Sequence, residues 1–150
     1  MSITGHLLSV YKTNTMCIFC QIVSWDAPSW TLYQDDLVTA FFDYFPASSG
    51  HLVIVPNQHH KNIFEIPEET LGHLAKVSKR IATVYKETLW IESINILQNN
   101  GALSGQTVFH YHMHLVPRSE GDSITFHWEA DESLREGFDN LRKKIVEELK

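Results

Sequence analysis

Three histidines occupy alternate positions, and this spacing is the feature of the sequence best suited to chemistry. His110, His112 and His114 alternate with the apolar residues Phe109, Tyr111, Met113 and Leu115. Alternate residues of an extended strand project from one face, so we expect the imidazoles in one row and the apolar residues opposite them, in the core. Imidazole can act as a nucleophile, a metal ligand or a proton donor near neutral pH. The pattern therefore predicts a chemical site on one face of a strand.

A single metal ion held by all three histidines is disfavoured by strand geometry. Cα atoms two residues apart lie about 6.6 Å apart, and those four residues apart lie about 13 Å apart. Ligands at the shorter spacing can share an ion with Zn–N distances of about 2 Å, whereas ligands at the longer spacing hardly can. At least one of the three histidines is therefore expected to do other work.

A polar, glycine-containing loop precedes the histidines. Residues 99–105 are rich in types that tolerate positive φ, and Gly105 is followed by Gln106, Thr107 and Val108. Consecutive backbone N–H groups with a hydroxyl can bind an anion. Alone such a loop is more often a simple turn, but beside aligned histidines it suggests a phosphate held next to an imidazole nucleophile.

The two cysteines of the chain form a Cys-x-x-Cys pair, Cys17 and Cys20. Two cysteines do not make a disulfide scaffold, and in a cytosolic protein this spacing more often binds metal or is redox-active. Residues 1–15 are a weakly patterned lead-in, and Met16 stands directly before the first cysteine. We expect the functional domain to span residues 16–150.

The remaining elements predict an α+β fold in which helices pack on an antiparallel sheet. A helix is expected to start near Pro67, followed by an apolar stripe with helical spacing that reaches Tyr85. A second helix is expected from about Asp131, with Leu134 among its apolar face. The expected strands are 30–34, 37–43, 51–55, 93–98 and 109–117.

Composition narrows the class of protein. The chain has 150 residues and a formal net charge of −6, which argues against a nucleic-acid-binding surface. No apolar run approaches the roughly 20 residues that cross a bilayer, and the first residues lack a secretory signal pattern. We expect one cytoplasmic domain that binds neither nucleic acid nor membrane.

Residues 110–116 match the motif His-φ-His-φ-His-φ-φ, and the chain resembles the histidine-triad (HIT) family. Further similar segments are Phe42-Asp43, 50–54, 56–59 and 99–101, so the resemblance runs from Cys17 to about Asp122. It implies an antiparallel sheet with packed helices, in a homodimer that acts on nucleotides. The pattern is most similar to zinc-containing bacterial members.

The resemblance implies that the middle histidine, His112, attacks the α-phosphorus of a nucleotide and that water resolves the nucleotidyl-imidazole. His114 and the amides of Thr107 and Val108 would stabilise the phosphate charge. Asn99, Gly105 and Gln106 complete the implied phosphate loop.

Other parts of a nucleotide site are implied with less specific patterns. Asp43 matches an acid that binds ribose, although it also suits a strand-ending turn. His51 matches a histidine at the edge of the phosphate site and equally suits a strand end in solvent. An apolar slot for the base, or alternatively plain core, is expected at Phe19, Ile22, Phe41 and Tyr44.

The resemblance also implies a structural zinc. Cys17 and Cys20 need two further ligands for a closed tetrahedral site, and the matching positions are His59 and His110. His60 is a competing ligand, and a free thiol pair is the alternative to any metal.

Two substrate classes remain open at this point. Nucleoside phosphoramidates and AMP conjugates suit the Hint branch of the family, and dinucleoside polyphosphates suit the Fhit branch. A zinc-organised nucleotide-binding protein with little catalysis is the non-enzymatic alternative.

Overall fold

A computed structural model of the chain describes residues 16–150. Its centre is a five-stranded sheet in the order β1-β2-β3-β5-β4, in which all neighbours are antiparallel. The predicted α+β class is confirmed. The expectations for residues 1–15 lie outside the described residues. The strands are β1 (Thr31–Gln34), β2 (Val38–Phe42), β3 (Leu52–Pro56), β4 (Ile94–Leu97) and β5 (Met113–Pro117).

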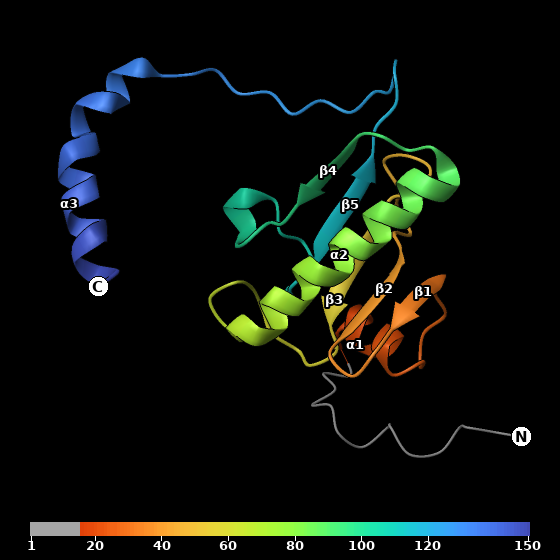
Figure 1. Cartoon of the computed structure of the whole chain (residues 1–150). Helices are drawn as coiled ribbons and strands as arrows, with labels where there is room; N and C mark the ends of the chain where they lie inside the picture. Colours follow the sequence, from red (N-terminus) through yellow and green to blue (C-terminus); the bar gives the residue numbers. More distant parts are fainter. Residues whose placement is uncertain (1–15) are drawn as a thin grey trace, which may run out of the picture.

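Helix α2 (Glu68–Leu89) covers one face of the sheet (Figure 1). It begins after Pro67, as predicted, because proline fits a helix N-terminus and two glutamates favour the first turn. Its buried Leu74, Val77 and Tyr85 pack with alternate residues of β3 and β5 in the larger core. The tyrosine also donates to the carbonyl of Gly50 at 2.8 Å, which anchors the entry to β3.

The opposite face of the sheet carries a smaller core that was not predicted as such. Val53 and Val55 of β3 point to this side, where they pack with Ile22 of helix α1 (Ile18–Val23). Helix α1 was not predicted, because six residues around the cysteines are too few for a visible helical period. The helix carries the second cysteine and Phe19 to the edge of the histidine site.

The predicted strand 109–117 is shorter than expected. Only Met113–Pro117 pair as a strand, so His110 and His112 lie on the irregular segment before it. The expected segregation nevertheless holds for Tyr111, Met113 and Leu115, which join the larger core. Phe109 was wrongly placed there: it is 43 % exposed, because the chain has not yet entered the sheet.

The C-terminal segment stands away from the sheet (Figure 1). Asp131 accepts from the Ser133 amide and caps a 3-10 turn, Glu132–Gly137, that leads into α3 (Phe138–Glu148). The predicted apolar stripe of this helix is exposed along its whole length. The homodimer expected from the family resemblance stays a prediction.

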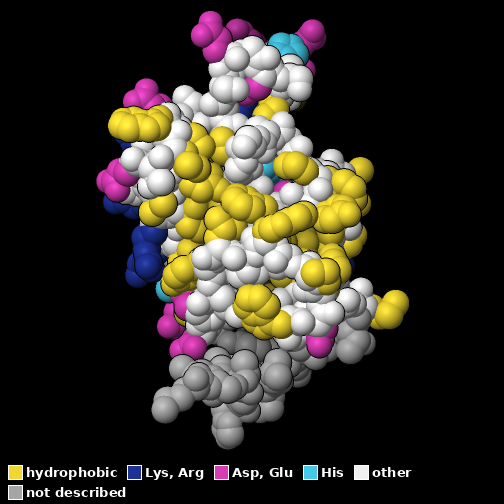
Figure 2. Space-filling model, turned by 90° about the vertical axis from the view of Figure 1, so that its right-hand side faces the viewer, with side chains coloured by type: hydrophobic (Ala, Val, Ile, Leu, Met, Phe, Trp, Pro, Cys, Tyr) yellow, Lys and Arg dark blue, Asp and Glu magenta, His cyan; other side chains and the backbone are white. Residues whose placement is uncertain are grey.

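Hydrophobic side chains also gather on the face shown in Figure 2. That view looks at the molecule from the right-hand side of Figure 1, where β1 lies. Aromatic rings are exposed in this part of the chain, where Trp30 stacks on Tyr44 with ring centroids 6.3 Å apart.

Within residues 16–150, no helix is long and apolar enough to cross a membrane.

Asn57 ties the end of β3 to the turn between β1 and β2. It is 2 % exposed, accepts from the Thr39 hydroxyl at 2.6 Å and donates to the Asp35 carbonyl at 2.7 Å. We expect Asn57→Ala to lower the free energy of unfolding by about 2 kcal/mol, because the buried Thr39 hydroxyl would lose its acceptor and the Asp35 carbonyl its donor. Urea denaturation measures this. The exposed Asn140→Ala is the control, expected within about 0.5 kcal/mol of wild type, and an equally small change at Asn57 would contradict the assignment.

Candidate active site and metal centre

His112 is held as a neutral ring with one nitrogen engaged. Its Nδ1 lies 2.8 Å from the carbonyl oxygen of His110, so Nδ1–H donates and the lone pair of Nε2 is left bare. Burial lowers the pKa of His112, an effect that the His110 carbonyl and Asp43 partly oppose. A neutral imidazole with a bare nitrogen is the form that can attack phosphorus.

Phe19 of α1 positions the His112 ring from the side. The two ring centroids lie 5.2 Å apart in an edge-on arrangement, and the same phenyl ring contacts Phe41 at 5.5 Å. Phe41 and Ile22 are buried in the smaller core. Of the four residues expected to line a base slot, Phe19 lies against the histidines, two are core, and Tyr44 is 74 % exposed beside Trp30.

His114 lies next to His112, with ring centroids 4.9 Å apart. Its Nδ1 is 2.9 Å from Nε2 of His51 and 3.6 Å from Oδ2 of Asp43. Burial lowers the pKa of His114 to about 4, and the neighbouring histidines act in the same direction while Asp43 opposes them. The structure thus brings together four residues that the sequence analysis had placed in one site.

The loop before the histidines is held by the side chain of Gln106. The buried amide accepts from the Gly101 N–H at 2.8 Å and donates to the carbonyls of Lys61 and Val108 at 2.7 and 3.2 Å. Gln106 was expected to position phosphate, whereas its contacts hold the loop itself. Gly105, at φ +91°, comes near Asn99, whose amide nitrogen would lie 3.5 Å from a Cβ there. Phosphate contacts by these residues, Thr107 and Val108 stay predictions.

Four metal-ligating side chains converge beside the histidine row. Nδ1 of His110 lies 3.4 Å from the sulfur of Cys17 and 3.5 Å from that of Cys20, whose sulfur is 3.3 Å from Nδ1 of His59. Tetrahedral zinc with Zn–S near 2.3 Å and Zn–N near 2.05 Å would separate its S and N ligands by about 3.6 Å. The donor set and its spacing therefore fit one zinc ion.

A backbone carbonyl orients His110, which belongs both to the histidine row and to the Cys/His cluster. Nε2 of His110 lies 2.8 Å from the carbonyl oxygen of Pro56 at the end of β3. Because a carbonyl can only accept, Nε2 carries the proton and Nδ1 is bare toward the cysteines. Metal-bound histidines commonly donate their other N–H in this way. Burial lowers the pKa of His110 to about 4, so the ring is neutral and able to ligate.

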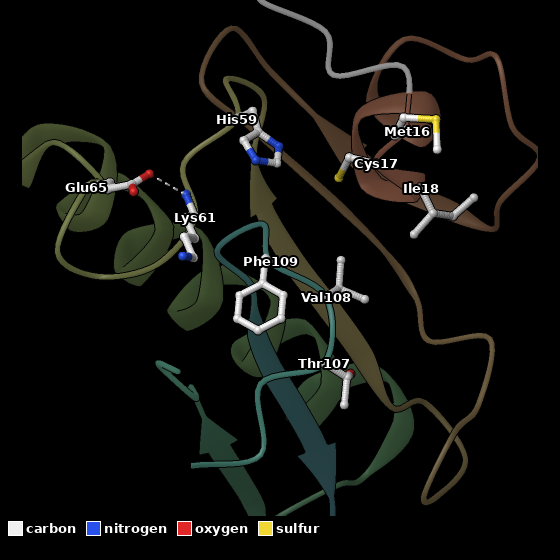
Figure 3. Close-up of a pocket in the computed structure, with 9 residues that line it drawn as sticks. All are labelled: Met16, Cys17, Ile18, His59, Lys61, Glu65, Thr107, Val108 and Phe109. Carbon is white, nitrogen blue, oxygen red and sulfur yellow. Dashed lines mark hydrogen bonds between the residues drawn. The ribbon is translucent and has the colours of Figure 1, made fainter. Parts of the chain in front are cut away.

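An open hollow of about 630 Å³ lies against this cluster (Figure 3). Cys17 and His59 of the cluster line it together with Thr107 and Val108 of the loop. The Lys61 ammonium lies 5.6 Å from the centre of the exposed Phe109 ring, another lining residue. The Cys/His cluster and the loop before the histidine row therefore border the same open hollow.

Sequence reasoning missed the backbone groups that fix these rings. Besides the carbonyls of Pro56 and His110, the Ala47 N–H lies 2.9 Å from Nδ1 of His51. Backbone groups have no residue-type signal, so only the folded chain reveals them. His73 lies outside this site, where its Nε2 is 2.6 Å from Oδ2 of Asp35.

We expect Gln106→Ala to free the loop without unfolding the sheet. Hydrogen exchange at the Gly101 amide should accelerate by at least about tenfold, because that N–H loses its acceptor. Mass-spectrometric or NMR exchange measurements test this. The exposed Gln58→Ala should leave the rate unchanged, and equal rates in both variants would show that Gln106 does not hold the loop.

The chain is similar in sequence to several known proteins. An uncharacterized HIT-like protein from Saccharolobus solfataricus is 37 % identical, and the match covers 90 % of this chain and 99 % of that protein. The adenosine 5'-monophosphoramidase of Saccharomyces cerevisiae is 34 % identical over 91 % and 84 % of the two chains. The adenylylsulfatase of Arabidopsis thaliana is 36 % identical over 79 % of this chain and 58 % of its own length.

Solved structures agree. A Streptococcus mutans protein superposes with a TM-score of 0.85 at 33 % identity, over 99 % of this chain and 94 % of that one. A zinc-bound histidine triad family protein from Mycobacterium smegmatis gives a TM-score of 0.71 at 35 % identity, over 87 % and 98 %. The HIT domain family model matches residues 25–121, a span that contains the histidine row, its loop and the Asp43–His51 pair. The chain belongs to the HIT family.

Proposed function

We propose that this protein is a nucleotidyl hydrolase or transferase that cleaves nucleotide conjugates at the α-phosphate through a covalent intermediate on His112. The observation that carries the proposal is the bare Nε2 of a buried, neutral His112 with a second imidazole, His114, beside it. A histidine that only packed against its neighbours would not need an unprotonated nitrogen facing the site.

The reaction follows in two steps. Nε2 of His112 attacks the α-phosphorus, a P–N bond forms, and the bond to the leaving group breaks as that group takes a proton from solvent. Water then attacks the same phosphorus and gives up a proton to solvent, the P–N bond breaks, and the electron pair returns to Nε2. The His110 carbonyl keeps its bond to Nδ1–H throughout, so the positive charge that develops on the ring meets a fixed acceptor.

Nucleoside phosphoramidates and AMP conjugates are the proposed substrate class. Two relatives, an adenosine 5'-monophosphoramidase and an adenylylsulfatase, support a nucleotide with a small leaving group. We assign Asp43 to the ribose hydroxyls, since it lies beside His51 and His114 and is one-fifth exposed.

Turnover of adenosine 5'-phosphoramidate and of a diadenosine polyphosphate tests the proposal. We expect wild type to prefer the phosphoramidate, and His112→Ala to reduce its rate by at least about a thousandfold because the nucleophile is lost. The control is His73→Ala, which removes a histidine paired with Asp35 away from the site and should retain activity.

Three outcomes would count against this assignment. Unchanged turnover in His112→Ala would exclude the nucleophile, and preference for the dinucleotide would favour the Fhit-like alternative. Failure of wild type to cleave either substrate would favour a nucleotide-binding protein with little catalysis.

We further propose that Cys17, Cys20, His59 and His110 hold a structural zinc ion. Tetrahedral coordination of the ion would link the N-terminal segment to the histidine row. The half-exposed positions of Cys17 and His59 on an open hollow make the site reachable by solvent and chelator.

Metal analysis of a matched pair of variants tests the zinc site. Wild type and His60→Ala should each retain roughly one equivalent of zinc, whereas His59→Ala should lose most of it and melt at a lower temperature. Zinc retained by His59→Ala and lost from His60→Ala would show that the neighbouring histidine is the ligand. Substoichiometric zinc in wild type would favour a free thiol pair.

A further inference from the structure

We propose that His51 is a positioning residue that fixes the proton of His114 on Nε2, the nitrogen from which His114 can donate to a substrate phosphate. This inference rests on the proposed function and deepens it. Its starting point is the short contact between the two rings, which join a loop before β3 to the middle of β5.

The first link in the chain of hydrogen bonds is a backbone amide. The Ala47 N–H lies 2.9 Å from Nδ1 of His51, which is 7 % exposed. An amide N–H can only donate, so Nδ1 of His51 must accept. A neutral His51 therefore carries its proton on Nε2.

The second link runs from His51 to His114. Nε2 of His51 and Nδ1 of His114 are 2.9 Å apart, a normal hydrogen-bond distance that admits one proton between the two nitrogens. Oδ2 of Asp43 is farther from each ring, at 3.4 Å from His51 and 3.6 Å from His114. Since His51 holds the proton, Nδ1 of His114 accepts it.

The hydrogen bond from His51 determines which nitrogen of His114 carries the proton. With Nδ1 accepting, neutral His114 must carry its own proton on Nε2. Burial lowers the pKa of His51, although the charge of Asp43 opposes this shift. Burial, together with neighbouring His112 and His51, lowers the pKa of His114 to about 4, again against the charge of Asp43. Both rings are therefore neutral at neutral pH, and only one arrangement of two protons satisfies all the contacts.

A metal ion is the rival explanation for this cluster. Asp43, His51 and His114 offer ligand atoms within 4.8 Å of one another, as the zinc cluster does. To ligate through Nε2, however, His51 would need its proton on Nδ1, where it would point at the Ala47 N–H. His110 has the opposite environment, since its far nitrogen donates to a carbonyl. The backbone therefore leaves the ligating nitrogen of His110 without a proton, whereas it places the proton of His51 on the nitrogen that a metal ion would need.

Long-range ¹H–¹⁵N NMR of the histidine rings tests the proposal directly, on the zinc-loaded full chain without substrate. We expect the His114 proton on Nε2 and a pyridine-like Nδ1. A His114 proton on Nδ1 in wild type would overturn the proposal. Shifts of His51 and His114 on addition of further zinc would also overturn it, in favour of a second metal site.

Two variants of similar size separate the donor from the bulk of the His51 ring. Gln at position 51 places an N–H near the place of Nε2, whereas Leu fills the space without a donor. We expect His51→Gln to keep kcat for adenosine phosphoramidate within about tenfold of wild type and to keep the His114 tautomer. His51→Leu should lose about a hundredfold in kcat with a smaller change in KM, and its His114 proton should move toward Asp43.

The outcomes separate this inference from the proposed function. Equal kcat and equal His114 spectra in His51→Leu and His51→Gln would show that the donor does not matter. If wild type cleaves no phosphoramidate, the proposed function fails while the NMR result still decides the tautomer. Melting curves of both variants check that each is folded at the assay temperature.

Discussion

The chemistry of this protein depends on fixed backbone groups that decide where each histidine keeps its proton. An imidazole has two nitrogens, and a neutral ring must leave one of them bare. The carbonyl of His110 holds the Nδ1 proton of His112, the carbonyl of Pro56 holds the Nε2 proton of His110, and the amide of Ala47 forces the His51 proton onto Nε2. Rings of one residue type thereby receive three different roles.

The sheet explains why these backbone groups lie where they do. β3 pairs with β5 through Leu52↔Leu115, Val53↔His114 and Ile54↔Met113, so the end of β3 runs beside the segment that carries the first two histidines. Pro56 closes β3 and its carbonyl oxygen lies 2.8 Å from Nε2 of His110, while Ala47 lies in the loop that enters the strand. Helix α1 then brings the cysteines and Phe19 against the same rings. One strand pairing thus positions both the proposed nucleophile, His112, and the proposed zinc ligands.

Residue type and spacing predicted the elements that bury a periodic face. The strand around Val53 and the helix after Pro67 follow directly from branched residues and from an apolar stripe. The histidine row was identified in the same way, although the strand itself begins only at Met113. Sequence could not predict that Phe109 would be exposed, because the irregular backbone before β5 has no periodicity. Nor could it predict that the Gln106 amide would bind three backbone groups, since those groups come from the fold.

The most direct test of the account is the identity of the atom that becomes bonded to phosphorus. Wild-type protein mixed rapidly with adenosine phosphoramidate, quenched in base and digested, can be mapped by mass spectrometry, and the linked nitrogen can be assigned by NMR. The account predicts an adenylyl group on Nε2 of His112, because Nδ1 is held by the His110 carbonyl. An adduct on His114, an adduct on Nδ1, or turnover without any protein-bound nucleotide would contradict it.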